Sequence, residues 1–407
     1  MFNIRTFDSL KNPVFRLFYG GMLGQMAAMN MQLVVRSLLI YRLSGSAAIL
    51  GLMALANAVP MVSLSLFGGV VADRVQKKYV LLTGQSCSAV VSLIVAITLT
   101  TGYLSAERAG SWWILIVTAT LQGIIMGIMM PSRQAIIAEI VEPNLLLNAV
   151  SLNTLGMNSL RFLTPAIGGL IVDYSGFDTV YYTTTVMYIV AVIFIAKMPV
   201  TGTVRIGPNN TLKDIKDGLR YIRHEPNILL ILLFALVVVV FSRPYQFLLP
   251  IFTDDVLKVG ATGLGILMSV SGVGAIFAST ILATMPNRKR GLLFLLSGLI
   301  LSLALIGFAF SQTWIISLAL ITFVGVGDTG RMTLANTLVQ YYVDNQYRGR
   351  VMSILIMEFG LMSFGVFFAG LLADVIGVQW SVGGLAAVLT FLSITMLCFS
   401  RRLRTLD

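Results

Sequence analysis

The sequence has 407 residues, of which 57% are hydrophobic and only 11% are charged. Soluble domains carry about 25% charged residues, so this composition excludes an ordinary soluble protein and indicates one that folds in a bilayer. The net charge of +11 does not indicate nucleic-acid binding, because the cations form short clusters between apolar runs and no basic face with interleaved aromatic residues. Both cysteines lie within apolar runs and no metal-ligand spacing is present, so we expect neither a metal nor a cofactor.

Long apolar runs follow one another along the chain, and a helix that crosses a bilayer needs about 20 mostly apolar residues. The pattern predicts an all-α membrane protein with twelve transmembrane helices in two six-helix bundles. The runs lie near residues 15–41, 47–72, 79–101, 112–138, 145–172, 180–198, 228–252, 262–284, 292–311, 314–342, 351–373 and 380–400.

One long polar break divides the runs into two sets of six. It predicts an N-terminal bundle at 1–200, a cytoplasmic linker at 201–227 and a C-terminal bundle at 228–407. Thr211 and Asp214 resemble a capping box, and apolar and basic residues then alternate at helical spacing. We expect an amphipathic helix here, lying either on anionic membrane lipids or in solvent.

The cations indicate the orientation of the chain. Most of the 28 Lys and Arg residues fall in segments that share one side if the N-terminus is cytoplasmic, and positively charged loops remain cytoplasmic. Both termini are therefore predicted to be cytoplasmic. The N-terminal segment is polar and predicts no signal peptide.

A polar stop between the second and third runs reads Gly-Val-Val-Ala-Asp-Arg-Val-Gln-Lys-Lys. Its key residues are Gly69, Asp73, Arg74, Lys77 and Lys78. We interpret it as a cytoplasmic gate in which Gly69 permits close helix approach and Asp73 and Arg74 pair or cap helix ends.

This stop resembles the signature between helices 2 and 3 of the major facilitator superfamily, except that Gln76 replaces a glycine. Thr164-Pro165-Ala-Ile-Gly168-Gly169 resembles the superfamily's antiporter motif, with Thr164 in place of glycine. Three further stretches resemble the enterobactin-exporter and macrolide-efflux branch: 131–152, 249–257 with 263–268, and 340–352. The resemblance implies a bacterial inner-membrane transporter that exports drugs, macrolides or siderophores, mostly by proton antiport.

Two acidic side chains fall inside apolar runs, where an ionisable group costs at least about 2.5 kcal/mol and is a functional candidate by default. Glu358 and Asp328 both lie near the predicted midplane, and we interpret them as proton-coupling residues. The alternatives are a pairing of Asp328 with Arg331 three residues later, and a hydrogen-bonded packing role for Glu358. The first apolar run contains no acid, so coupling is expected in the second half.

Arginines inside the runs outnumber these acids and favour an anionic or strongly hydrogen-bonding amphiphile. The candidate substrate-binding residues are Arg36, Arg161, Arg243, Arg331, Asn30, Gln32, Asn158, Tyr245 and Gln246. The alternative is that each arginine pairs with an acid or a helix carbonyl. Arg133 is expected to tie the cytoplasmic gate.

Together with the resemblance, these patterns predict a monomeric secondary transporter and not an enzyme. The resemblance implies export by alternating access against an inward flow of protons, and the arginines favour a small amphiphilic molecule that is anionic. No Gly-x-x-x-x-Gly-Lys-Ser/Thr loop is present for ATP. Two alternatives remain open: a lysophospholipid flippase or importer, and a ligand sensor with a transporter fold that does not transport.

Overall fold

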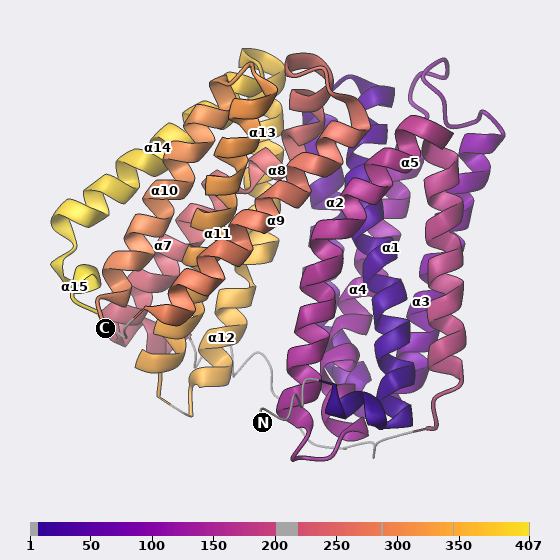
Figure 1. The fold of residues 1–407 in the computed structure, drawn as a ribbon, viewed down its shortest axis with the longest axis horizontal. Coiled ribbons are helices and arrows are strands. Elements are labelled where there is room, and N and C mark those ends of the chain that lie inside the picture. The colour runs from indigo at the N-terminus through magenta and orange to yellow at the C-terminus, as the bar shows by residue number, and fades with distance from the viewer. Residues whose placement is uncertain (1–6, 201–218, 286–287, 345, 407) are drawn as a thin grey trace, which may run out of the picture. The chain divides into compact units, whose positions relative to one another are not determined.

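The computed structural model describes residues 7–200, 219–285, 288–344 and 346–406, and within these ranges the chain is helical without a strand (Figure 1). A helix satisfies its own backbone hydrogen bonds, which lipid cannot do, so long apolar runs adopt this structure. The predicted all-α membrane fold is confirmed.

The first half begins with a short 3-10 helix, Asp8–Lys11, followed by five long helices. These are α1 (Pro13–Ser44), α2 (Ala47–Arg74), α3 (Lys77–Thr100), α4 (Trp113–Ile140) and α5 (Leu146–Ala196). The 51-residue α5 contains two predicted spans, because Gly176 has φ 88° and turns the chain between them.

The second half is more broken. Its helices are α7 (Pro226–Ser242), α8 (Pro244–Ile251), the π-helix η2 (Phe252–Val256), α9 (Gly260–Thr284), α10 (Arg290–Phe310), α11 (Trp314–Tyr342), α12 (Arg348–Ile356), α13 (Glu358–Ile376), α14 (Val378–Phe399) and α15 (Arg401–Arg404). Two predicted spans are divided here: 228–252 becomes α7, α8 and the start of η2, and 351–373 becomes α12 and α13.

By length and hydropathy alone, nine helical stretches among the described residues qualify as membrane spans. Three features explain why fewer than twelve qualify. The fifth and sixth predicted spans share α5, the first corresponds to the less apolar α1, and the eleventh is shortened by the break between α12 and α13. With these three accounted for, the arrangement is consistent with twelve crossings.

The helices group into two compact units. The first unit contains Met1–Gly45, Ala56–Asn209 and Gly260–Ile266, and the second contains Ser46–Leu55, Asn210–Val259 and Leu267–Asp407. The N-terminal turns of α2 therefore belong to the second unit, and those of α9 belong to the first. The predicted amphipathic linker helix lies mostly outside the described residues.

Local sequence explains how α1 begins and ends. Asn12 accepts hydrogen bonds from the amides of Val14 and Phe15, and Pro13 occupies a position where no amide donor is needed. The Asn12 side chain also donates to the Ile140 carbonyl, 2.8 Å away at the end of α4. Gly45 ends α1 in the left-handed conformation that glycine adopts without strain.

Candidate functional site

Four ionisable side chains meet within the second unit. Arg243 lies between α7 and α8, Asp328 and Arg331 lie one turn apart on α11, and Glu358 is the first residue of α13. We call these four residues the charged cluster. All four are candidates from the sequence, and the fold joins three separate spans to assemble them.

Two of the four stand at breaks in their helices. Pro244 has no amide hydrogen, so the helix that ends at Ser242 cannot continue its bonding through that position. Before Glu358, the Met357 amide donates to the Ile354 carbonyl at 3.1 Å, a three-residue span tighter than an α-turn. Interrupted helices at membrane depth are typical of the binding and coupling sites of transporters.

The two acids are held differently. Arg243 Nη2 donates to Asp328 Oδ2 at 2.8 Å, and Arg331 Nη2 lies 3.6 Å from Asp328 Oδ1. Glu358 Oε2 lies 3.7 Å from Arg331 Nη1, which is an ion pair beyond hydrogen-bonding distance. With both acids ionised, the two arginines are neutralised.

Three of the four residues are buried, and the Asp328 side chain is 18% exposed. Arg331 is 1% exposed, Arg243 6% and Glu358 8%, and Glu358 Oε2 has no hydrogen-bond partner among the described residues. A buried carboxylate oxygen without a hydrogen bond is poorly stabilised. Glu358 is therefore the more weakly held of the two acids.

The neighbouring helix α8 adds two of the predicted substrate-binding residues. Gln246 Oε1 accepts a 3.1 Å hydrogen bond from Arg243 Nη1, and Tyr245 is buried beside it. Gln246 therefore lies with the charged cluster, and Tyr245 is its buried neighbour in sequence.

The predicted residues of the first unit are not gathered into one cluster. Gln32 Nε2 donates to Ser92 and Thr184 side chains at 2.9 and 3.2 Å, which ties α1 to α3 and α5. The Asn30 amide donates to the Met26 carbonyl of its own helix at 2.8 Å. Asn158 and Arg161 lie exposed on α5.

Arg36 lies near two tyrosines from the second half of α5. Among the described residues, its Nε and the hydroxyls of Tyr181 and Tyr188 have no hydrogen-bond partner. No carboxylate of the described chain lies within 4.0 Å of this guanidinium.

The predicted gate motif contributes two cations that have partners. Lys77 Nζ lies 2.6 Å from Glu139 Oε1, and Lys78 Nζ donates to the Met198 carbonyl. Arg74 is exposed. The Asp73 side chain lies outside what the structure describes, so its pairing stays a prediction.

The assignment of close helix packing to Gly69 is wrong. In the part of the chain that the structure describes, a Cβ at Gly69 would meet nothing within 4 Å, whereas one at Gly68 would lie 2.4 Å from the Gly127 carbonyl oxygen of α4. Adjacent helical residues point about 100° apart, and the sequence does not reveal which of two adjacent glycines faces the neighbour.

The antiporter-like motif of α5 lies at close contacts with α1 and with the start of α9. Thr164 donates from its hydroxyl to the Leu160 carbonyl of its own helix, and Pro165 is buried. A Cβ at Gly168 would lie 2.8 Å from the Met31 side chain, and one at Gly169 would lie 2.2 Å from the Ala261 carbonyl oxygen. The motif thus packs α5 against α1 and the start of α9.

Two matching carboxylates cap helices, a role that our sequence interpretation missed. Asp374 of α13 accepts from the amides of Ala47 and Ala48 at 2.7 and 3.1 Å, at the start of α2. Asp173 of α5 accepts from the Thr262 amide at 2.8 Å, at the start of α9. The sequence did contain a signal, because Gly168-Gly-Leu-Ile-Val-Asp173 in the first half resembles Gly370-Leu-Leu-Ala-Asp374 in the second.

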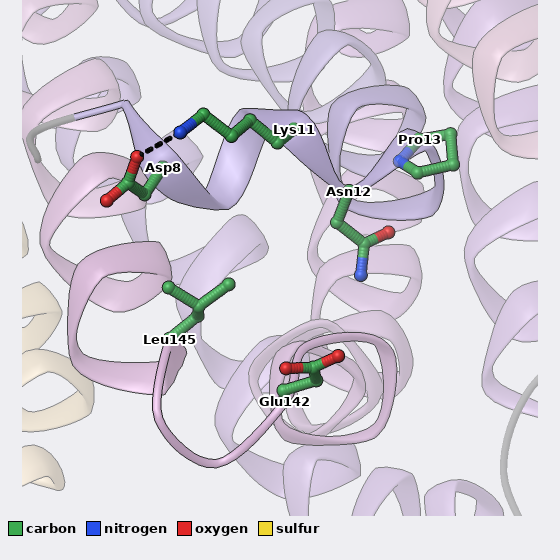
Figure 2. A pocket seen from close by; sticks show the side chains of 6 residues that line it. All are labelled: Asp8, Lys11, Asn12, Pro13, Glu142 and Leu145. Atoms are coloured by element: carbon green, nitrogen blue, oxygen red, sulfur yellow. Dashed lines mark hydrogen bonds and ion pairs between the residues drawn. The ribbon is translucent and has the colours of Figure 1, made fainter.

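A shallow pocket of about 520 Å³ opens at the start of the chain (Figure 2). It is lined by Asp8, Lys11, Asn12, Pro13, Glu142 and Leu145. Asp8 and Lys11 pair at 2.7 Å, and the pocket contains none of the predicted substrate-binding residues. Among the described residues no group of acidic, His or Cys side chains is arranged for a metal.

A family model described as transmembrane secretion effector matches residues 4–407. The chain belongs to the transmembrane secretion effector family. This is a family of major facilitator transporters, so the protein is a multi-pass membrane transporter and not an enzyme.

Relatives of this chain include a protein named as a staphyloferrin A transporter and one named as a multidrug resistance protein. The staphyloferrin A transporter of Staphylococcus aureus (strain NCTC 8325 / PS 47) is 26% identical over 377 residues, covering 92% of this chain and 91% of the relative. The multidrug resistance protein MdtG of Salmonella typhimurium is 26% identical over 300 residues, covering 70% of this chain and 69% of the relative.

The fold agrees with solved transporters. A bacterial homologue of the human lysosomal transporter Spinster has a TM-score of 0.74 at 13% identity and covers 96% of this chain and 97% of its own. The nucleoside transporter NupG has a TM-score of 0.73 at 13% identity, with coverages of 94% and 99%. The predicted major facilitator fold is thereby confirmed.

Proposed function

We propose that this protein exports a small amphiphilic molecule from the bacterial cytoplasm across the inner membrane by alternating access, driven by protons that move inward through Glu358. We further propose that it acts as a monomer of two bundles with both termini cytoplasmic. The observation that carries the proposal is the loosely paired, dry carboxylate of Glu358 at a helix break.

The charged cluster suits coupling because its ion pairs can exchange. When Glu358 takes up a proton, Arg331 loses one partner and retains Asp328, 3.6 Å away. Release of the proton restores the original pairing. A residue that alternates between two such states responds to a proton gradient, provided that the helix breaks on either side adjust with it.

The cargo is proposed to be a siderophore-like or drug-like amphiphile. Relatives named for staphyloferrin A and for multidrug resistance support this class. The sulfur-rich and apolar interior of the first unit also supports it, because methionine side chains adapt to varied shapes.

Everted vesicles with an acidic interior test the proposal. We expect them to accumulate exported cargo, and a protonophore to abolish the accumulation. Binding without gradient-dependent accumulation of any cargo would contradict export and favour the sensor. Movement of lysophospholipid in the opposite direction would favour the flippase.

A further inference from the structure

Among the described residues, the buried Arg133 of α4 has no anionic partner. It is 7% exposed, and the described chain places no carboxylate within 4.0 Å of it. Its terminal nitrogens instead face two thioethers: Nη1 lies 3.7 Å from Met26 Sδ, and Nη2 lies 3.2 Å from Met130 Sδ. Thioether sulfur is a weak acceptor, so this cation is poorly compensated.

The side-chain amide of Gln25 is a second buried N–H donor that faces thioether sulfur. Gln25 Nε2 lies 3.6 Å from Met129 Sδ and 4.0 Å from Met126 Sδ, although Gln25 is fully buried. Its own oxygen already accepts from Gln85 Nε2 at 3.4 Å. Two buried side chains between α1 and α4, Gln25 and Arg133, therefore direct N–H donors at flexible methionine side chains.

We propose that Arg133 binds a carboxylate of the transported molecule, with Met26 and Met130 occupying the place of its two oxygens when the site is empty. Both terminal nitrogens face acceptors, and a carboxylate offers two oxygens to such a fork with one compensating charge. Methionine is unbranched and can swing aside. The inference rests on the proposed export function and assigns the cargo a carboxylate.

Equilibrium binding without a gradient tests this site. The probes are 4-butylbenzoate and its uncharged amide, measured by calorimetry on the full chain in nanodiscs at neutral pH. We expect the wild-type protein to bind the carboxylate about tenfold more tightly than the amide, as a charge-assisted fork requires. Equal affinities, or binding of neither probe, would overturn the proposal.

Arg133→Met fills the sulfur-lined space with a side chain of similar length and no charge. We expect it to reduce the carboxylate-to-amide preference to about one while the amide affinity changes less than about twofold. Arg42→Met, which removes an exposed cation from the same helix bundle, is the matched control and should keep the preference. A retained preference in Arg133→Met, or the same loss in Arg42→Met, would refute a specific site.

Met130→Leu provides a test that leaves the arginine in place. If the sulfur only occupies the oxygen position, this variant keeps or increases the carboxylate preference, whereas a fall to about one overturns the proposal. This arm decides the question if Arg133→Met does not fold. These affinities are measured without a gradient, so they do not depend on whether the protein exports its cargo. The proposed export function and the proposed carboxylate site can therefore fail separately.

Discussion

Replacing Glu358 by glutamine removes its charge and its exchangeable proton while conserving its shape. At an effective dielectric constant of 20, a pair 3.7 Å apart is worth about 4.5 kcal/mol before desolvation is subtracted. The two contacts of Asp328, at 2.8 and 3.6 Å, together give about 10 kcal/mol on the same scale. Protonation of Glu358 therefore gives up less than half the attraction that protonation of Asp328 would.

This difference predicts distinct phenotypes. Glu358→Gln should abolish uphill transport, lowering accumulation to the equilibrium ratio, and should leave cargo exchange within about threefold of wild type, because no buried acid loses its partner. Asp328→Asn, the matched control, should impair both, because Arg243 and Arg331 then share one weakly paired carboxylate.

The assay uses proteoliposomes loaded with unlabelled cargo. Exchange is followed with labelled cargo at equal pH, and uphill transport with an imposed pH gradient. Uphill accumulation by Glu358→Gln equal to that of wild type would refute the assignment of proton coupling to this residue.

Three further predictions follow from packing and electrostatics. Gly68→Ala should lower transport and thermal stability, because its Cβ would lie 2.4 Å from the Gly127 carbonyl oxygen, whereas the Cβ of Gly69→Ala meets no described residue and this variant should be neutral; equal effects on the two unfolding midpoints would contradict this packing. Arg331→Met should destabilise the protein by about 3 kcal/mol, since it leaves Asp328 and the buried Glu358 with one arginine; an unchanged unfolding temperature in detergent would count against these ion pairs. Asp374→Asn should speed hydrogen exchange at the first two amides of α2 about tenfold, because both lose a charged acceptor. Unchanged exchange by mass spectrometry would show that the cap contributes little.

Much of the fold was predictable because the thickness of the bilayer sets the length of each apolar run, and the polar breaks mark where the chain leaves the membrane. The helix breaks were less visible. Pro244 is an evident signal, but residues 351–357 before Glu358 contain neither proline nor glycine, so the run 351–373 appeared continuous. Its break is seen only in the three-residue hydrogen bond from the Met357 amide to the Ile354 carbonyl.

The candidate site was predicted in part. The sequence identified Asp328, Glu358, Arg243 and Arg331 because charges within apolar runs are rare and costly. It did not distinguish the arginines that pair from those that do not. For Arg133, the position near a helix end suggested a role in the gate. Its burial against the sulfur atoms of Met26 and Met130 became evident only from the packing of α1 on α4.

The sequence alone determined the membrane class, the all-α fold and the transporter family, since these depend on composition, periodicity and contiguous motifs. Only the tertiary structure decided which charges neutralise one another, which glycine makes a contact and which arginines have no acid beside them among the described residues. The physical reason is that helix rotation sets each side chain's neighbours. A rotation of 100° between adjacent residues separates Gly68 from Gly69, and apolar runs carry little record of that angle.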